Sequence, residues 1–157
     1  MITKVVEINI QGDVKKKDNI QLSRDDIYYT LTELDKSYSE KMSSHMDLKT
    51  YSEKLYFNSN FVVCRGKNNI IGIIAYYANL IEKKAYIPYV CVSVNSRGEG
   101  VASKMMQAVI NEVANYCDSI ELEVRNTNFK AILLYKKYGF IENGLRGAKI
   151  NMIRRQK

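Results

Sequence analysis

The chain has 157 residues, of which 46% are hydrophobic, so it has enough apolar material for one core of ordinary size and is not expected to be disordered. Twenty-four Lys and Arg residues against seventeen Asp and Glu residues give a net charge of +7. This excess favours an anionic partner such as nucleic acid, an acidic membrane or a phosphorylated small molecule. Charge alone does not choose among the three.

The cysteines argue for a reducing compartment. Cys64, Cys91 and Cys117 are odd in number, widely separated and set among apolar residues, and His45 is the only histidine. Without a Cys-x-x-Cys pair, neither a disulfide framework nor a bound metal is expected. No apolar run approaches the ~20 residues that a membrane span requires. We therefore expect a cytoplasmic protein with no membrane association.

The first third of the chain predicts a strand and two helices. Residues 3–11 have strand character, and the three lysines at 15–17 indicate a solvated basic turn. Ser23 followed by Asp26 resembles a capping box, from which apolar residues recur at helical spacing to about residue 38. Asp47 is placed to cap a second helix.

Strands dominate the middle of the chain. Residues 61–65 and 70–78 are β-branched and aromatic runs, and the turn residues 66–69 between them predict a hairpin. A third strand is expected over about 85–94. It contains the only proline, Pro88, which cannot donate to a strand ladder and indicates a bulge or a local loss of pairing.

The remaining elements alternate between helix and strand. A helix with a broad apolar face is expected to start at Gly100, followed by a strand at 119–124, a helix at 128–138 closed by Gly139, and a last strand at 149–155. No internal repeat, linker or change in composition interrupts the chain. We expect a single domain that spans residues 1–157.

One junction carries chemistry. The strand that ends near Val94 runs into residues 95–100, which include Gly98 and Gly100, and a helix begins at once. The first amides of a helix have no partner inside it and attract anionic oxygen, and glycines let the backbone bend and a bulky anion approach. The junction is therefore predicted to hold a phosphate. It lacks the spacing of nucleoside-triphosphate and dinucleotide loops.

Two motifs resemble those of one enzyme family. The segment Arg97-Gly98-Glu99-Gly100-Val101-Ala102 matches Arg/Gln-x-x-Gly-x-Gly/Ala, the pyrophosphate-binding signature of the GNAT (Gcn5-related) N-acetyltransferases. The second half of the chain resembles the second signature of this family, which is formed here by Asn128, Ala131, Tyr135, Gly139 and Phe140. The order of the expected elements from residue 23 onward is also similar.

The resemblance implies a fold and a co-substrate. The fold is a mixed α/β (α+β) GNAT fold, with a central, mostly antiparallel twisted sheet of six to seven strands, about four flanking helices and splayed central strands. The donor co-substrate is acetyl-CoA, and no metal takes part. The residues implied to bind acetyl-CoA are Val92, Val94, Arg97, Gly98, Glu99, Gly100, Val101, Ala102, Ser103, Asn128, Ala131 and Tyr135.

The implied catalytic residues are Tyr135 and Glu123. Tyr135 would donate a hydrogen bond to the leaving thiolate, because complete proton transfer from an ordinary tyrosine costs about 2 kcal/mol. Glu123 is the first candidate for the base that deprotonates the acceptor, although Glu121 and Glu123 share a strand face and could form a solvated pair. Weaker candidates are Tyr86, Tyr89 and His45.

The acceptor is expected to bind residues 23–58, which carry no sharp signature. A small primary amine is preferred, and a protein N-terminus or lysine is the alternative. A silent acyl-CoA-binding protein of the same fold is a second alternative. No recognition motif supports nucleic-acid binding. Both a monomer and a homodimer remain open.

Overall fold

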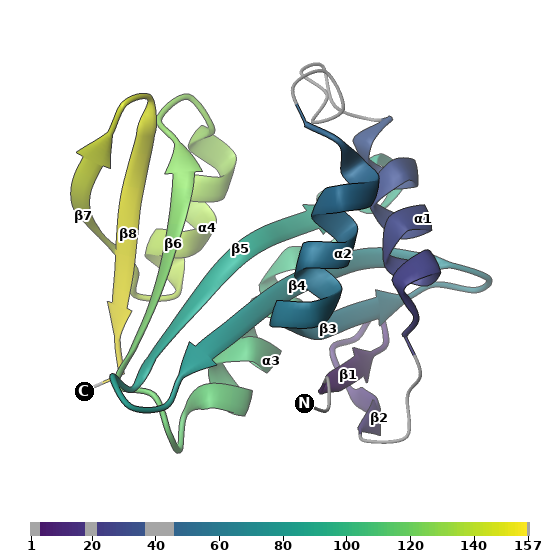
Figure 1. The fold of residues 1–157 in the computed structure, drawn as a ribbon, viewed down its shortest axis with the longest axis horizontal. Helices are drawn as coiled ribbons and strands as arrows, with labels where there is room; N and C mark the ends of the chain where they lie inside the picture. The colour runs from purple at the N-terminus through teal and green to yellow at the C-terminus, as the bar shows by residue number, and fades with distance from the viewer. Residues whose placement is uncertain (1–3, 18–21, 37–45, 157) are drawn as a thin grey trace. The chain divides into compact units, whose positions relative to one another are not determined.

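The computed structural model describes residues 4–17, 22–36 and 46–156 (Figure 1). Within them the α/β class is confirmed. The strands and helices in chain order are β1 (Val5–Ile8), β2 (Val14–Lys17), α1 (Arg24–Asp35), α2 (Leu48–Asn58), β3 (Asn60–Arg65), β4 (Ile70–Asn79), β5 (Lys84–Val92), the 3₁₀ turn η2 (Val94–Ser96), α3 (Val101–Val113), β6 (Ser119–Arg125), α4 (Phe129–Lys137), β7 (Ile141–Arg146) and β8 (Lys149–Arg155).

The described strands form one hydrogen-bonded series in the order β2-β1-β3-β4-β5-β6-β8-β7. Eight strands exceed the six to seven expected, and the two additions are β2 and β7. The basic turn predicted at residues 15–17 was wrong, because these lysines belong to β2, which pairs antiparallel with β1. Strand β7 had no counterpart in the prediction, and both additions lie at the ends of the series.

The helix starts predicted from local signals are confirmed. The Ser23 hydroxyl accepts from the Asp26 amide at 3.0 Å, and the Asp26 carboxylate accepts from the Ser23 amide at 2.9 Å, which completes a capping box. Asp47 caps α2 by accepting from the Lys49 amide at 3.0 Å. These short-range bonds satisfy amides that the helices cannot satisfy themselves.

The chain forms two compact units, each made of two separate segments. The first unit comprises Met1–Ala75 and Tyr89–Ala108, and the second comprises Tyr76–Pro88 and Val109–Lys157. The core of the first unit packs apolar side chains of α1 and α2 against β3, β4 and β5. Its buried members are Val5, Leu22, Ile27, Leu31, Leu34, Leu55, Phe61, Val63, Ile73, Ala75, Tyr89 and Cys91.

Strand β6 organises the second unit. It pairs in parallel with β5 from Lys84↔Ser119 to Ile87↔Leu122, and in antiparallel with β8 along its full length. Ile120, Leu122 and Val124 are buried, whereas Glu121 and Glu123 between them are half-buried. Alternate residues of a strand point to opposite faces, so β6 presents one apolar face and one carboxylate-bearing face.

We predict that Leu31→Ala lowers the free energy of unfolding by about 2–5 kcal/mol, because Leu31 is fully buried in the first core and its loss leaves a cavity. The matched control is Leu133→Ala in α4, where the side chain is 68% exposed and a change below about 0.5 kcal/mol is expected. Urea denaturation of both variants measures the difference. Equal losses in the two variants would contradict this core assignment.

Candidate functional site

The predicted phosphate-binding junction lies in the first unit. Strand β5 ends at Val92, η2 follows at Val94–Ser96, and α3 begins at Val101. Gly98 and Gly100 have φ angles of +82° and +81°, a left-handed conformation that side chains with a Cβ rarely adopt. The predicted order of a strand, a bend with two glycines and a helix start is thus confirmed.

The predicted strand end at Val94 was wrong. We expected β5 to continue to Val94, but the strand stops two residues earlier and Val94 opens the 3₁₀ turn with its side chain half-exposed. The amide of Ser93 already donates to the Ile71 carbonyl at 2.8 Å, and the amide of Ser96 donates back to Ser93 at 2.9 Å. Val94 is therefore part of the loop and not of the strand.

Arg97 holds this loop in place. Its Nε donates to the Val92 carbonyl oxygen at 3.1 Å, which ties the guanidinium to the end of β5. Two further side chains fix the start of α3: Val101 is buried, and Lys104 Nζ donates to the Ile10 carbonyl at 2.7 Å. The first turn of α3 is therefore anchored within the first unit by one buried apolar side chain and one hydrogen bond.

The glycine positions are open. A Cβ at Gly98 would meet no heavy atom within 4 Å, and one at Gly100 would meet only Lys104 Cε at 3.9 Å. These glycines are needed for their backbone conformation and not because neighbours crowd them. The amides of Val101, Ala102 and Ser103 precede Lys104, whose amide makes the bond to Gly100 at 3.1 Å. Glu99 is exposed between the two glycines.

The second motif lies in the second unit, where it builds the ends of α4. Asn128 caps the helix by accepting from the Ala131 amide at 3.3 Å. Gly139 has a φ of +88°, and the Phe140 amide donates back to the Tyr135 carbonyl at 3.0 Å. Asn128 and Gly139 thus define where the helix starts and where it stops, and Ala131 is half-exposed on its first turns.

Tyr135 is buried, and its ring centroid lies 5.9 Å from that of Phe140. Burial raises the pKa of Tyr135 to about 12, since the phenolate would lose its hydration. The hydroxyl therefore stays protonated at neutral pH and can act as a hydrogen-bond donor.

Glu123 is held by an arginine that the sequence did not point to. Arg146 donates from Nε to Glu123 Oε2 at 2.7 Å and from Nη2 to Oε1 at 2.6 Å. The hydrogen bonds and charge of Arg146 are the main reason why the pKa of Glu123 lies below its ordinary value, with smaller contributions from Lys149 and Tyr86. The carboxylate is ionised and paired.

The other candidate bases lie in different places. Tyr86 faces Glu123, and burial together with that carboxylate raises its pKa. Tyr89 is buried in the first core, where its ring centroid lies 6.2 Å from that of Tyr51. His45 lies outside the described residues.

The predicted site residues are divided between the two compact units. Val92, Val94 and residues 97–103 form one group in the first unit. Glu123, Asn128, Ala131 and Tyr135 belong to the second unit. Sequence reasoning missed Arg146 and Asn151, which flank Glu123 from β7 and β8. Only knowledge of strand pairing could have found them, because they lie more than twenty residues away along the chain.

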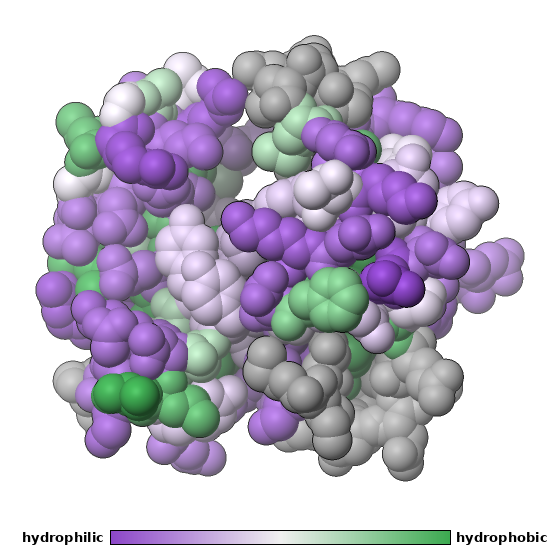
Figure 2. All heavy atoms as spheres, viewed as in Figure 1, coloured by the Kyte–Doolittle hydropathy of each residue, from purple (hydrophilic) through white to green (hydrophobic). Residues whose placement is uncertain are grey.

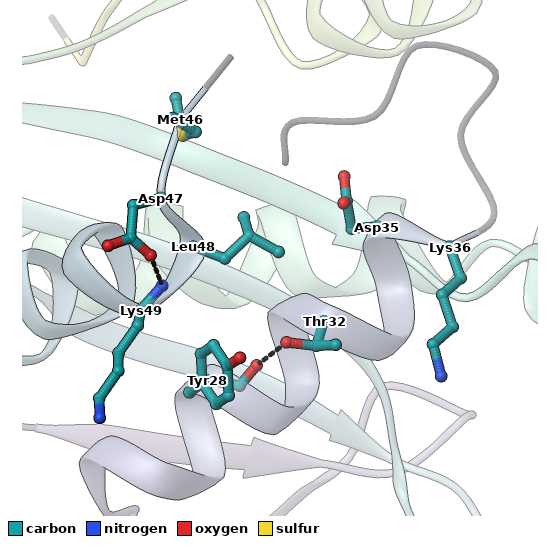
Figure 3. Close-up of a pocket in the computed structure, with 8 residues that line it drawn as sticks. All are labelled: Tyr28, Thr32, Asp35, Lys36, Met46, Asp47, Leu48 and Lys49. Carbon is teal, nitrogen blue, oxygen red and sulfur yellow. Dashed lines mark hydrogen bonds between the residues drawn. The ribbon is translucent and has the colours of Figure 1, made fainter. Parts of the chain in front are cut away.

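A pocket of about 400 Å³ lies in the segment expected to bind the acceptor (Figure 3). Helix α1 contributes Tyr28, Thr32, Asp35 and Lys36, and residues 46–49 at the start of α2 complete the lining. The Asp47 carboxylate points to the helix start, and hydrogen bonds from Thr50 and the Lys49 amide lower its pKa. The lining mixes both charge signs with apolar surface.

The described residues contain no group of three or more His, Cys, Asp or Glu side chains that could hold a metal ion. No helix among them is long and apolar enough to cross a membrane.

Comparison with solved structures identifies the fold. The ribosomal-protein-S18-alanine N-acetyltransferase from Escherichia coli aligns with a TM-score of 0.73 at 16% identity over 88% of this chain and 92% of that one. The PaiA N-acetyltransferase from Thermoplasma acidophilum, in complex with coenzyme A, aligns with a TM-score of 0.69 at 13% identity over 87% and 96%. PH1933 from Pyrococcus horikoshii OT3 aligns with a TM-score of 0.72 at 21% identity over 91% and 96%.

These neighbours share the fold of the N-acetyltransferases. The sequence model of the acetyltransferase (GNAT) family matches residues 26–140, which is most of the chain, and the chain therefore belongs to this family. It is an acetyltransferase. No curated protein matches the sequence significantly.

We predict that Gly98→Ala lowers the free energy of unfolding by about 1–2 kcal/mol, because alanine is strained at a φ of +82° although space is available. Glu99→Ala is the matched control on the adjacent exposed residue, and it should change stability by less than about 0.5 kcal/mol. Thermal or urea unfolding measures both. If the Gly98→Ala variant were as stable as the control, the left-handed turn would not be required.

Proposed function

We propose that this protein transfers the acetyl group of acetyl-CoA to a primary amine of a small molecule by direct attack in a ternary complex. The observation that carries the proposal is the open glycine turn of residues 97–100, which leads directly into the first amides of α3. A helix start of this kind suits an anion such as the pyrophosphate of coenzyme A. We further propose that residues 1–157 act as one domain, because neither compact unit is a continuous segment of the chain.

The proposed contacts with acetyl-CoA are those that the family resemblance implies. The amides and glycines of residues 97–103 bind the pyrophosphate, and the backbone near Val92 and Val94 binds the pantetheine arm. Asn128, Ala131 and Tyr135 line its thioester end. The fit is supported by the exposed, open backbone at Gly98 and by the absence of a crowding side chain above Gly100 in the described structure.

The proposed chemistry needs a base and a stabilised leaving group. An alkylammonium has a pKa near ~10.4, so the acceptor must lose a proton before its nitrogen attacks the carbonyl carbon. Glu123 is proposed to take that proton, directly or through water. The C–N bond forms, the C–S bond breaks, and the electrons of the broken bond leave on the sulfur of coenzyme A.

Tyr135 is proposed to stabilise the departing thiolate by a hydrogen bond. With a tyrosine pKa of about 12 and a thiol pKa near ~8.5, complete proton transfer to sulfur is uphill by about 5 kcal/mol. This cost is larger than for an ordinary tyrosine, so burial strengthens the case for donation without transfer. The thiolate then takes its proton from solvent.

The acceptor proposal rests on the segment that contains α1 and α2. The pocket of Figure 3 offers charged, polar and apolar groups in a volume suited to a small molecule. A protein acceptor is the second candidate, because one protein with this fold is named for its action on an alanine of ribosomal protein S18. A panel of small amines and N-terminal peptides, scored by thiol release, separates the two.

We predict that acetyl-CoA raises the melting temperature selectively. At about 100 times its Kd, acetyl-CoA should stabilise the native state by about 2.7 kcal/mol, whereas ATP and NAD at equal ionic strength should act weakly. A thermal-shift titration measures this, with Gly98→Ala as the variant expected to weaken the response. An equal shift with ATP would mean that the glycine turn binds anions in general and is not selective for coenzyme A.

We predict that Tyr135→Phe lowers kcat strongly and leaves the affinity for acetyl-CoA nearly unchanged, because it removes one hydroxyl and keeps the packing against Phe140. Loss of one preorganised donor to a developing charge costs about 10²–10³ in kcat. Tyr138→Phe at the end of the same helix is the matched control. Wild-type turnover in the Tyr135→Phe variant would remove this residue from the mechanism.

A further inference from the structure

Arg146 covers the carboxylate that we propose as the base. The two bonds from Nε and Nη2 form a bidentate fork on Glu123. The exposed fractions of the two side chains differ greatly, at 19% for Glu123 and 73% for Arg146. The carboxylate thus belongs to the sheet surface, whereas the guanidinium lies over it from the solvent side.

Among the described residues, a hydrogen-bond acceptor without a partner lies on the residue opposite Glu123. Asn151 lies opposite Glu123 in the β6–β8 register and donates from Nδ2 to Glu121 Oε1 at 3.2 Å. Its Oδ1 is buried and has no hydrogen-bond partner in the described structure. Tyr86 from β5 and Lys149 from β8 are the other titratable groups that act on Glu123. The face of β6–β8 seen in Figure 2 is mostly hydrophilic, which fits a surface that meets a polar ligand.

We propose that Arg146 and the acceptor, a primary alkylammonium, compete for the same carboxylate. The guanidinium of Arg146 binds Glu123 in the free protein and is displaced when the ammonium of the acceptor binds there. This inference rests on the proposed function and deepens it by naming a residue that controls how the acceptor reaches Glu123. Arg146 acts through Glu123 and is a positioning residue.

Proton transfer requires the exchange. Arginine stays protonated in proteins and cannot accept a proton from an amine, and while it is bound it keeps the pKa of Glu123 low. Its departure removes the largest cause of that lowering, and the ammonium that takes its place, unlike a guanidinium, can give up a proton. The proton then moves from the ammonium to the Glu123 carboxylate, and the neutral amine that remains attacks the thioester.

An ammonium fits the vacated place. It has three N–H donors, so it can replace the guanidinium on Glu123 and still offer donors to a neighbouring oxygen such as Oδ1 of Asn151, the residue opposite Glu123 in the β6–β8 register. The guanidinium of Arg146 satisfies Glu123 but not that oxygen. Arg146 can leave, because it is the last residue of β7, beside a turn at Gly147 with a φ of +61°, and because its side chain is 73% exposed.

Steady-state kinetics of Arg146→Gln tests the exchange. For an alkylamine acceptor we expect kcat/KM to rise about fivefold, mainly through a lower KM. A fivefold change corresponds to about 1 kcal/mol, the upper end of what an exposed ion pair contributes. An arylamine, which is uncharged at neutral pH, should gain nothing. Arg155→Gln is the charge-matched control at the other end of the same sheet, opposite Ser119, and it should leave both substrates unchanged. A fall in kcat/KM, or an equal effect of the control, would overturn the proposal.

A second measurement does not need turnover. In protein labelled at the glutamate carboxyl carbon, the Glu123 NMR signal should titrate at higher pH in Arg146→Gln than in the wild type. Butylammonium should shift this signal in both proteins, at about fivefold lower concentration in the variant, whereas tetramethylammonium, which has no N–H, should shift neither. If butylammonium did not shift the Glu123 signal in the variant, the proposed exchange would be wrong. A wild type that binds acetyl-CoA but acetylates no amine would count against the proposed function alone.

Discussion

The left-handed turn between β5 and α3 is the constraint on which the rest of the proposed site depends. A helix can present its first amides to an anion only if the chain that leads into it turns away from them. Gly98 and Gly100 make that turn with positive φ angles, and Arg97 fastens it to the end of β5. Because Val101 is buried, the helix start cannot shift to relieve the loop. The orientation of the amides is therefore determined before any ligand arrives.

Features that local bonds determine could be predicted from the sequence. The Ser23 and Asp26 capping box and the Asn128 cap each join residues three positions apart, so a short stretch of sequence contains all of their partners. The same holds for the glycine turn, whose conformation follows from the residue type. The helices were predicted for this reason, and the inner strands from their runs of β-branched and aromatic residues, with ends that differ by a few residues, as at Val94.

Features that depend on tertiary pairing could not be predicted in this way. The lysines of β2 look like a solvated turn because an edge strand, paired on one side, tolerates charge that an inner strand would not. In β7, the pair Asn143 and Gly144 resembles a turn, yet the chain passes through it as an irregularity in the ladder with β8. Glu123 and Arg146 are 23 residues apart and meet only because β7 and β8 fold back beside β6.

The excess of positive charge bears differently on the two halves of the proposed reaction. It favours the binding of an anionic donor anywhere on the surface, but it works against a carboxylate base, because each nearby cation lowers the pKa of the group that must take a proton. In the described structure Glu123 is affected by Arg146 and Lys149 together. An acceptor that brings its own cation replaces one of these charges with one that can lose its proton. Such a substrate therefore pairs with the Glu123 carboxylate on binding and is then placed to give its proton to that carboxylate, whereas a neutral amine brings no charge that could displace Arg146.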